Sequence, residues 1–302
     1  MPELPDVVVY IESLQPRIVG QKLERVRIAS PFVLRSVTPP ISAVVGKTVR
    51  GLRRLGKQIV LHFENDLFII IHLMIAGRFQ WKQPRAKIPG KLGLAAFDFP
   101  SGTLLLTEAG SKKRASIHTA QGESGLAAFN RCALEVLECS LDEFKEILTR
   151  ENHTVKRSLT DPRLFSGIGN AYSDEILHRA RLSPLKLTFK LNVEEITRLY
   201  EATRTTLTEW TERLRKETGS GFPTKVTAFR PEMAVHGRFG KPCPVCGSPV
   251  QRIVYAENEC NYCATCQTEG RLLADRAMSR LLKEDWPRSI DEWEVHIESR
   301  RG

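Results

Sequence analysis

Apolar runs broken by turn residues predict strands through much of the first 120 residues. QIVLHF (58–63) and LFIIIHL (67–73) are β-rich runs separated by the residues END, which predicts a hairpin. LGLAAFDF (92–99) and TLLLTEA (103–109) flank PSG and predict a second hairpin. PRAKIPGK (84–91) is typical of a loop. This part of the chain is therefore expected to form a sandwich or barrel of antiparallel strands.

Helical periodicity replaces this pattern elsewhere. Residues 5–19 carry a dense apolar run that predicts an N-terminal helix. Ser140 and Glu143 form a capping-box pattern before apolar residues at helical spacing. Residues 192–216 repeat apolar groups along one face, and a further helix is predicted over 271–283. The second half of the chain is thus expected to open as a helical domain.

Two Cys-x2-Cys motifs carry the strongest chemical signal. Cys243 and Cys246 form the first pair, and Cys263 and Cys266 form the second. Four thiolates from two tight turns suit tetrahedral Zn²⁺, whereas a redox Cys-x2-Cys does not account for two motifs at this spacing. Cys260 also lies three residues before Cys263, but the second motif gives a hairpin whose arms each end in a ligand pair. Cys132 and Cys139 are predicted to be buried apolar residues.

The balance of charge indicates a polyanionic partner, either nucleic acid or an anionic membrane, although a solvated basic surface without a specific partner is common. Lys and Arg number 45 against 35 Asp and Glu, and the pI is near 9.4. No signal peptide is recognisable, and the most apolar stretch (67–77) is too short to span a membrane. Clustering of five cysteines in 243–266 argues against a secreted disulfide framework. A soluble, cytoplasmic protein without a membrane segment is expected.

The sequence SGIGNAY (166–172) precedes a helical run at 173–180 and places Asn170 where a helix begins. Helix N-termini bind phosphate through their free N–H groups, although a plain turn between helices fits this motif equally well. Basic residues recur at turns throughout the chain, as expected for a surface that follows a phosphate backbone. They include Arg53, Arg54, Lys57, 112–114, Lys156, Arg157 and Arg252.

The N-terminal sequence MPELPD is either a frayed end or a reactive group. Removal of Met1 exposes the secondary amine of Pro2 next to Glu3. An α-amine titrates well below lysine and can attack an electrophilic carbon to give a Schiff base. A neighbouring carboxyl group can transfer the protons that such a reaction needs. In a protein that binds nucleic acid, the accessible electrophile is the sugar carbon that carries the base.

Taken in order, these motifs resemble the formamidopyrimidine-DNA glycosylase and endonuclease VIII family. The resemblance rests on MPELPD, the Gly56-Lys57 turn, His72-Leu73, GIGNAYSDEIL (167–177), VHGRFGKPC (235–243) and the four cysteines. It implies an α+β multidomain fold: an N-terminal β-sandwich with flanking helices, a helix–two-turn–helix domain and a C-terminal zinc hairpin. The predicted boundaries are 1–125, 138–232 and 235–268, followed by an extension over 269–302.

The resemblance also implies a monomeric enzyme that acts on damaged double-stranded DNA. The Pro2 amine would attack the sugar C1′ of a flipped nucleotide, and elimination would then cut the strand. Glu3 matches the family's proton-transfer carboxylate and Lys57 a catalytic and phosphate-binding lysine. The other positions matched to DNA-binding residues are His72, Ile75, Lys156 and Asn170, and Glu175 matches a family acid.

Three departures from the family pattern bear on the substrate. Residues 108–115 replace the loop that carries the Arg and Phe expected to fill the space of the flipped base. Ile75 stands where the family has a Met wedge. Asn258 stands where the family has an arginine in the zinc hairpin, and Arg252 on the same hairpin is the candidate to replace that arginine. These changes leave the nucleophile in place and leave the preferred lesion open among oxidised bases, ring-opened bases and abasic sites.

Two other functions fit part of the sequence. A non-catalytic, zinc-containing DNA-binding protein on the same scaffold accommodates the altered 108–115 loop and Asn258. A zinc-ribbon RNA-binding or translation-associated protein accommodates the charge and the cysteines, but it gives the N-terminus no role. The glycosylase hypothesis uses both ends of the chain and is preferred.

Overall fold

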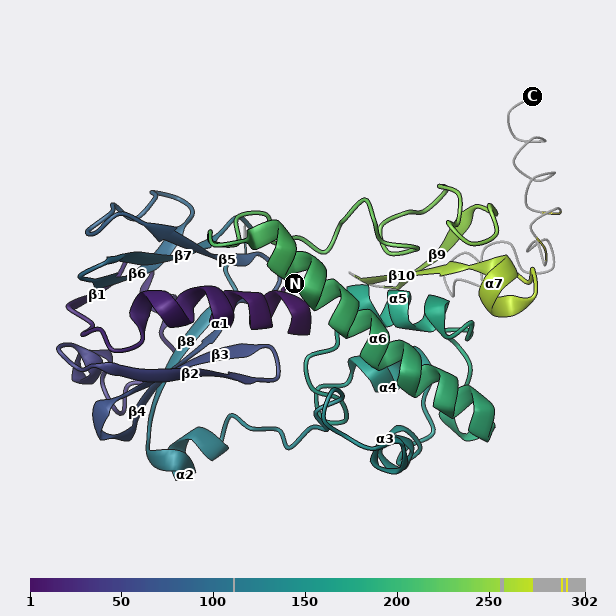
Figure 1. Ribbon diagram of the computed structural model, residues 1–302, viewed down its shortest axis with the longest axis horizontal. Helices are drawn as coiled ribbons and strands as arrows, with labels where there is room; N and C mark the ends of the chain where they lie inside the picture. The colour runs from purple at the N-terminus through teal and green to yellow at the C-terminus, as the bar shows by residue number, and fades with distance from the viewer. Residues whose placement is uncertain (111, 256–257, 274–288, 290–291, 293–302) are drawn as a thin grey trace. The chain divides into compact units, whose positions relative to one another are not determined.

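The computed structural model describes residues 1–302 except 111, 256–257, 274–288, 290–291 and 293–302. The chain forms two compact units (Figure 1). The first contains residues 1–133 and 208–227, and the second contains 134–207 and the part of the chain from 228 onward. Most of the helix predicted over 271–283 lies outside the described residues.

Two four-stranded antiparallel sheets make up the first unit. One sheet has the order β1-β6-β7-β5 and the other β2-β3-β4-β8. The strands are β1 (Arg25–Ile28), β2 (Val49–Leu55), β3 (Gln58–Phe63), β4 (Leu67–His72), β5 (Gly77–Lys82), β6 (Gly93–Phe99), β7 (Gly102–Glu108) and β8 (Ser116–Gln121). Both predicted hairpins, β3–β4 and β6–β7, are confirmed, and so is the predicted sandwich.

Helix α1 (Leu4–Ile18) completes the core of the first unit. Its buried residues Val7, Tyr10, Leu14 and Ile18 recur at helical spacing and share one apolar cluster with residues from both sheets. The Tyr10 ring packs edge-on against Phe79, with centroids 5.5 Å apart. Burying each large apolar side chain contributes about 1.5–3 kcal/mol, so the core fixes where the N-terminus emerges.

Alternation along the strands divides the apolar residues of β3 and β4 between two faces. Ile59, Leu61 and Ile69 face the main core. Val60, Phe68 and Ile70 form a second cluster with Leu126 of α2 (Gly122–Ala127). Because both faces of this sheet are covered, the strands read as continuous apolar runs in the sequence. The short 3₁₀ turns of this unit are Pro31–Val33, Ile41–Val44 and Glu64–Asp66.

The second unit is built from helices and a β-hairpin. Its helices are α3 (Leu141–Leu148), α4 (Val155–Thr160), α5 (Asn170–Arg179), most of α6 (Val193–Thr218) and α7 (Ala264–Thr268), with a 3₁₀ turn at Thr188–Lys190. Strands β9 (Val250–Tyr255) and β10 (Asn258–Cys263) pair antiparallel. Of all the element pairs that involve α5, its packing against β10 is the most extensive.

Side-chain caps mark the starts of α3 and α6. The Ser140 N–H donates to Glu143 Oε2 at 2.8 Å, and Ser140 Oγ accepts from the Glu143 N–H, which confirms the predicted capping box. Asn192 Oδ1 accepts from the Glu195 N–H at 2.8 Å at the start of α6. Such caps satisfy N–H groups that the helix itself leaves without partners.

Two sequence-based expectations about isolated cysteines have different outcomes. Cys139 is buried, as predicted, but Cys132 is exposed, so that prediction is wrong. The Cys132 N–H donates to Asn130 Oδ1 at 2.9 Å in a local turn, and its φ is +52°. This turn keeps the thiol out of both cores. Among the described residues, no helix is both long and apolar enough to cross a membrane.

Candidate functional site

The N-terminal residues are buried and held in place. Pro2 is buried, and Glu3 is only 2% exposed. The Glu3 N–H donates to Asp6 Oδ2 at 3.0 Å in the first turn of α1. Leu4 and Pro5 open the helix, where proline is well tolerated because no N–H is needed there. The frayed-end interpretation of MPELPD is therefore wrong.

Electrostatics around this terminus favour a neutral amine. Burial lowers the pKa of the Met1 amine below its usual 8.0, and the nearby charges of Arg78 and Lys57 lower it further, against Glu3 and Asp6. Burial also lowers the pKa of Lys57, whose charge is stabilised by Glu3. Burial thus destabilises the charge of both the Met1 amine and Lys57, and Glu3 opposes this effect on each of them, which is typical of a reactive centre.

Lys57 and His72 come from neighbouring positions of one sheet. Lys57 lies in the β2–β3 turn after Gly56, whose φ is +59°, and Gln58 pairs with His72 across β3–β4. Burial, followed by the charges of Lys57 and Arg131, lowers the pKa of His72 to about 4, so this imidazole is neutral at physiological pH. A neutral imidazole can donate a hydrogen bond without adding to the positive charge.

Ile75 lies at the tip of the tight turn between β4 and β5. It is 54% exposed, which is unusual for a large apolar residue, and Met74 beside it has a φ of +53°. Gly77 closes the turn, because a Cβ there would lie 2.2 Å from the Leu73 carbonyl oxygen. The turn therefore displays Ile75 on a fixed base.

The altered loop after β7 is closed by a buried acid that the sequence did not point to. Glu108 is 2% exposed, and its Oε2 accepts from the N–H groups of Arg114 at 2.9 Å and Ala115 at 3.1 Å. Lys113 Nζ donates to the Glu108 carbonyl oxygen. The basic residues of this loop are consequently carried on a short closed turn.

A buried charge network organises the second unit. Lys156 Nζ lies 2.5 Å from Asp174 Oδ1, and His236 Nδ1 lies 2.7 Å from Asp174 Oδ2. Lys156 also donates to Ser173 Oγ at 3.0 Å, and the Asn261 N–H donates to Asp174 at 3.1 Å. Although burial opposes it, the charges of Lys156 and His236 lower the pKa of Asp174. The sequence had singled out Lys156 but not Asp174, its charged partner.

Glu175 fastens the segment that leads into the hairpin. Its carboxylate accepts from three consecutive N–H groups, those of Ala234, Val235 and His236, at 2.7–2.9 Å. Burial raises the pKa of Glu175, and the three hydrogen bonds oppose this shift. The structure thus places this predicted family acid in an anchor for the backbone. Asp174 and Glu175 follow the Asn170 motif directly, which was the available signal for their importance.

Asn170 and Arg252 meet at one residue of the hairpin. Asn170 Nδ2 donates to the Glu259 carbonyl oxygen at 2.8 Å, and α5 begins at Asn170 as the motif predicted. Arg252 Nη1 lies 3.6 Å from Glu259 Oε2, and its guanidinium stacks on Phe239. The structure therefore brings these two predicted DNA-binding residues together at Glu259.

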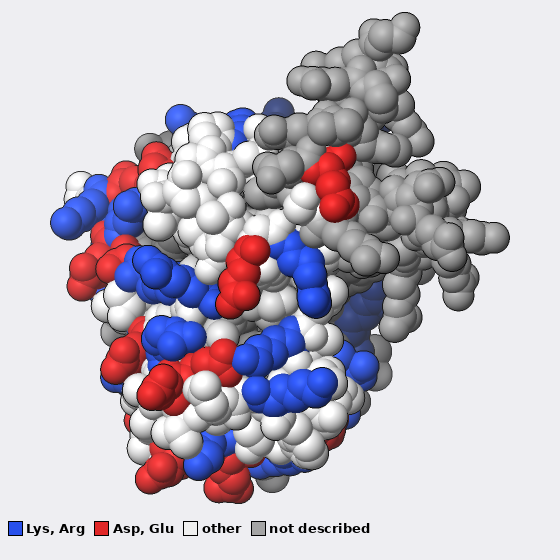
Figure 2. Space-filling view, turned by 90° about the vertical axis from the view of Figure 1, so that its right-hand side faces the viewer, with Lys and Arg blue, Asp and Glu red and all other residues white. Residues whose placement is uncertain are grey.

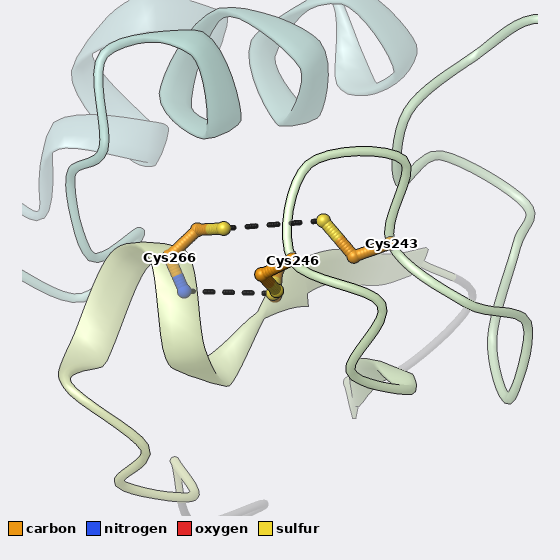
Figure 3. A group of neighbouring side chains, drawn as sticks. Cys243, Cys246 and Cys266 are labelled. Atoms are coloured by element: carbon orange, nitrogen blue, oxygen red, sulfur yellow. Dashed lines mark hydrogen bonds between the residues drawn. The ribbon is translucent and has the colours of Figure 1, made fainter.

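Four cysteines form a metal-binding constellation at the end of the hairpin. The Sγ atoms of Cys243, Cys246, Cys263 and Cys266 all lie within 4.8 Å of one another. The Sγ atoms of Cys243 and Cys266 point toward each other and are 3.9 Å apart (Figure 3). Those of Cys246 and Cys263 are 3.3 Å apart. Four thiolates around a tetrahedral ion at about 2.3 Å lie roughly 3.8 Å apart, so these residues fit such an ion.

Residues around this constellation support its assignment. His178 Nε2 lies 3.2 Å from Cys243 Sγ, as a neighbour that orients a ligand does. Cys260 lies outside the group of four and packs with Ile253 and Tyr262, so the choice between Cys260 and the second motif is settled for the second motif. Burial raises the pKa of the Cys260 thiol, which keeps it protonated.

Positive and negative charges are mixed on the surface of the second unit that Figure 2 shows. Lys and Arg are interspersed there with Asp and Glu, without a surface of one sign. Near the N-terminus, the cations Lys57, Arg78 and Arg131 likewise stand with the acids Glu3 and Asp6. The balance of charge therefore does not by itself locate a binding site for a polyanion.

Comparison with known proteins agrees with these features. A family model described as the formamidopyrimidine-DNA glycosylase N-terminal domain matches residues 1–109, and one described as its H2TH domain matches residues 135–220. A formamidopyrimidine-DNA glycosylase of Solibacter usitatus is 30% identical over 277 residues, covering 88% of this chain and 99% of that protein. The chain belongs to the formamidopyrimidine-DNA glycosylase family.

Other family members agree along most of the chain. The formamidopyrimidine-DNA glycosylase of Thermus thermophilus is 32% identical over 284 residues, and the match covers 89% of this chain and 100% of that protein. A protein of Mycobacterium tuberculosis described as an uncharacterized formamidopyrimidine-DNA glycosylase-like protein is 42% identical over 149 residues, covering 49% of this chain and 92% of that protein. The family predicted from the motifs is confirmed.

Solved structures of the family share the fold. The Lactococcus lactis glycosylase bound non-covalently to DNA with an abasic site has a TM-score of 0.77 at 26% identity, covering 88% of this chain and 99% of that one. A structure of MutM in complex with DNA containing carbocyclic 8-oxo-G also has a TM-score of 0.77, at 25% identity, covering 88% of this chain and 100% of that one. The predicted β-sandwich, helix–two-turn–helix domain and cysteine hairpin are those of the family.

Proposed function

We propose that this protein is a bifunctional DNA glycosylase and abasic-site lyase that removes oxidised or ring-opened bases. The buried N-terminus carries this proposal, because burial and the charges of Arg78 and Lys57 lower the pKa of the amine there. Removal of Met1 puts the Pro2 nitrogen at the end of the chain, one residue from that amine. The same surroundings favour the neutral, nucleophilic form of the Pro2 amine.

The reaction follows from these groups. The Pro2 nitrogen attacks C1′ of the damaged nucleotide, and the bond from C1′ to the base breaks. The base leaves with the electron pair and takes up a proton, while the Pro2 nitrogen loses its own. Glu3 then donates a proton to the ring oxygen, which opens the sugar and leaves an iminium on Pro2. Loss of a proton from C2′ expels the 3′ phosphate and cuts the strand. Water finally releases the sugar fragment from Pro2.

Binding of damaged duplex DNA is assigned to residues of both units, acting in a monomer. Lys57, His72 and Ile75 serve in the first unit, and Lys156, Asn170 and Arg252 serve in the second. Complexes of related glycosylases with DNA support this role. Lys156 is 5% exposed and paired with Asp174, so we propose that it acts by holding the N-terminal end of α5 in place. The relatives are bacterial, so the proposed site of action is a bacterial nucleoid.

The ion held by the four cysteines is proposed to be one structural Zn²⁺. Four thiolates in two Cys-x2-Cys turns are the ligand set that Zn²⁺ favours, and they leave no open position for catalysis. The ion would hold α7 and the hairpin together and supply no chemistry to the reaction. Metal analysis of purified protein should find one zinc per chain, and zinc-free protein that keeps its hairpin intact would contradict this assignment.

Borohydride trapping tests the proposed chemistry. Duplexes with an oxidised purine, a ring-opened purine, an oxidised pyrimidine or an abasic site are each incubated with protein and sodium borohydride. The expected result is a covalent adduct that peptide mass spectrometry places on Pro2. Pro2→Gly should cut DNA at least about a hundredfold more slowly, because the ring no longer fixes the nitrogen. The absence of an adduct with every one of these duplexes would overturn the proposal.

A non-catalytic DNA-binding protein is the second candidate. It is favoured by the Glu108-closed turn, which stands where the family loop would fill the space of a flipped base. This alternative predicts salt-sensitive binding of DNA that Pro2→Gly leaves unchanged, together with no strand cleavage by the wild-type protein. Strand cleavage that Pro2→Gly abolishes would exclude it.

A further inference from the structure

Phe239 is a large apolar side chain that contacts a charged group at the surface. It lies four residues before Cys243 and is 45% exposed. The Cζ atom of Arg252 lies 4.4 Å from the centroid of the Phe239 ring. A guanidinium at this distance over an aromatic face is attracted by the negative charge of the ring face. The ring thus restricts where the Arg252 side chain can lie.

Strand pairing places an acid on the other side of Arg252. Arg252 of β9 pairs with Asn261 of β10, so Glu259, two residues earlier on β10, is its diagonal neighbour. The Arg252 Nη1 to Glu259 Oε2 distance is 3.6 Å, with side-chain exposures of 44% and 30%. Such a long, solvated ion pair is weak, and a stronger acceptor can replace it.

Glu259 also receives the side chain of Asn170. Asn170 Nδ2 donates to the Glu259 carbonyl oxygen at 2.8 Å, so donors from α5 and from β9 converge on one residue. A phosphate carries a full negative charge and accepts two parallel hydrogen bonds from arginine, whereas the present contact to Glu259 is a single long one. The arrangement therefore suits a phosphate better than it suits Glu259.

We propose that Phe239 is a positioning residue for DNA binding. Its ring holds the Arg252 guanidinium beside Glu259, to which Asn170 also donates, so that both side chains bind one phosphate of the damaged strand. The phosphate takes the place of the Glu259 carboxylate as the partner of Arg252. Phe239 itself makes no contact with DNA and acts through Arg252 alone. The proposal rests on the DNA-binding part of the function proposed above.

A double-mutant cycle tests this dependence. Binding of a duplex with a tetrahydrofuran abasic analogue is measured at several salt concentrations for wild type, Phe239→Leu, Arg252→Gln and the double variant. Arg252→Gln is expected to weaken binding about tenfold and to lower the salt slope by about one. Phe239→Leu should weaken binding about threefold to fivefold. In the Arg252→Gln background the leucine should have no further effect, because coupled residues are not additive.

Matched variants separate positioning from general structural damage. Phe239→Tyr keeps the aromatic face and should bind like wild type. Phe189→Leu makes the same chemical change at another exposed phenylalanine of this unit, 62% exposed, and should leave affinity unchanged. If Phe239→Leu weakens binding equally with and without Arg252, the ring acts in some other way and the proposal is wrong.

The role of Glu259 gives an independent test that leaves the ring intact. Glu259→Gln should tighten binding more than Glu201→Gln, which removes the same charge from an exposed position of α6. If Glu259→Gln binds DNA more weakly than Glu201→Gln, or equally well, the proposal is wrong. If Phe239→Leu loses its metal and cannot be interpreted, this comparison serves as the test. If the wild-type protein binds DNA but forms no borohydride adduct, only the proposed chemistry is refuted. The role of Phe239 is tested separately, by the double-mutant cycle with Arg252.

Discussion

Buried charge is handled in opposite ways in the two units. In the first, burial lowers the pKa of both the Met1 amine and Lys57, and Arg78 and Lys57 add to the effect on the amine. In the second, Lys156 is 5% exposed, yet it faces Asp174 at 2.5 Å, with Ser173 at 3.0 Å. The partly buried cations near the terminus are thus under-compensated, whereas the buried cation beside α5 is fully paired.

This difference indicates that the charged groups near the N-terminus serve the reaction, whereas those beside α5 serve the fold. A cation that burial and like charges destabilise gives up its proton more readily, which is what a nucleophilic amine requires. A cation that is paired and hydrogen-bonded keeps its proton and fixes the groups around it. We therefore expect substitutions near Pro2 to change rates with little effect on folding, and substitutions around Asp174 to change folding first.

Acylation of the Pro2 nitrogen is expected to have the largest effect. One extra glycine between Met1 and Pro2 turns this nitrogen into a tertiary amide without a nucleophilic lone pair. Strand cleavage should fall by about a thousandfold or more, while affinity for tetrahydrofuran DNA stays within about threefold. Gel-based cleavage and equilibrium binding measure both. Unchanged cleavage would show that the N-terminal region is not the reactive one and that it does not differ from the second unit in this way.

Asp174→Asn should produce the next largest effect, which is a loss of folding stability. It leaves Lys156 buried without its charged partner, which typically costs about 3–5 kcal/mol. Hydrogen exchange should therefore accelerate in peptides of α5, with peptides of β3 and β4 as the internal control. Glu201→Gln, an exposed charge removal in the same unit, should change exchange little.

The pH dependence of this stability follows from the sign of the shift. Asp174 has a folded-state pKa below its usual 3.8, so its stabilising contribution is complete above that value. It is lost as the pH falls through the lower, folded-state pKa. The stability difference between wild type and Asp174→Asn should therefore be constant near neutral pH and shrink only below about pH 4. A difference that already shrinks between pH 7 and 5 would contradict this assignment.

Removal of the metal should have a smaller, local effect. Chelation is expected to unfold the hairpin around Cys243 and Cys266, because metal binding and folding are coupled in such modules. DNA affinity should fall at least about tenfold, since Arg252 loses its support. Circular dichroism and binding before and after chelation, with zinc restored as the control, measure this effect. Full DNA affinity in metal-free protein would show that the hairpin is dispensable.

The smallest expected effect is a shift in the pH–rate profile. Lys57 lowers the pKa of the N-terminal amine, so Lys57→Gln should raise that pKa. The rate of borohydride trapping should then rise with pH at a higher pH than in the wild type, even if the maximum rate also falls. Lys57→Arg keeps the charge and should leave this rise in place. An unmoved rise in Lys57→Gln would show that this charge does not tune the nucleophile.

Much of the fold could be predicted because its signals are local. Continuous apolar runs with turn residues gave the hairpins β3–β4 and β6–β7, and capping patterns gave the starts of α3 and α6. The four metal-binding cysteines were recognisable because ligand spacing is a short-range property. The frayed-end alternative for the N-terminus could be rejected only once the structure showed Pro2 and Glu3 to be buried.

Long-range partners were not predictable in this way. Asp174 and His236 are 62 residues apart, and nothing in either neighbourhood specifies the other. Glu108 closes its own loop through backbone N–H groups, which leave no trace in the residue types around it. Cys132 was expected to be buried on the average behaviour of cysteine, but a local turn held by Asn130 overrides that average.

The anchoring of residues 234–236 by Glu175 has a consequence for how this segment can vary. Glu175 binds only backbone N–H groups there, so the attachment is indifferent to which side chains the segment carries. The side chains of Val235 and His236 are nonetheless buried, Val235 in the apolar cluster with Cys243 and His236 against Asp174. Exchange in this segment is therefore limited by the packing of its side chains, whereas the attachment to Glu175 requires only that each residue keeps its backbone N–H group.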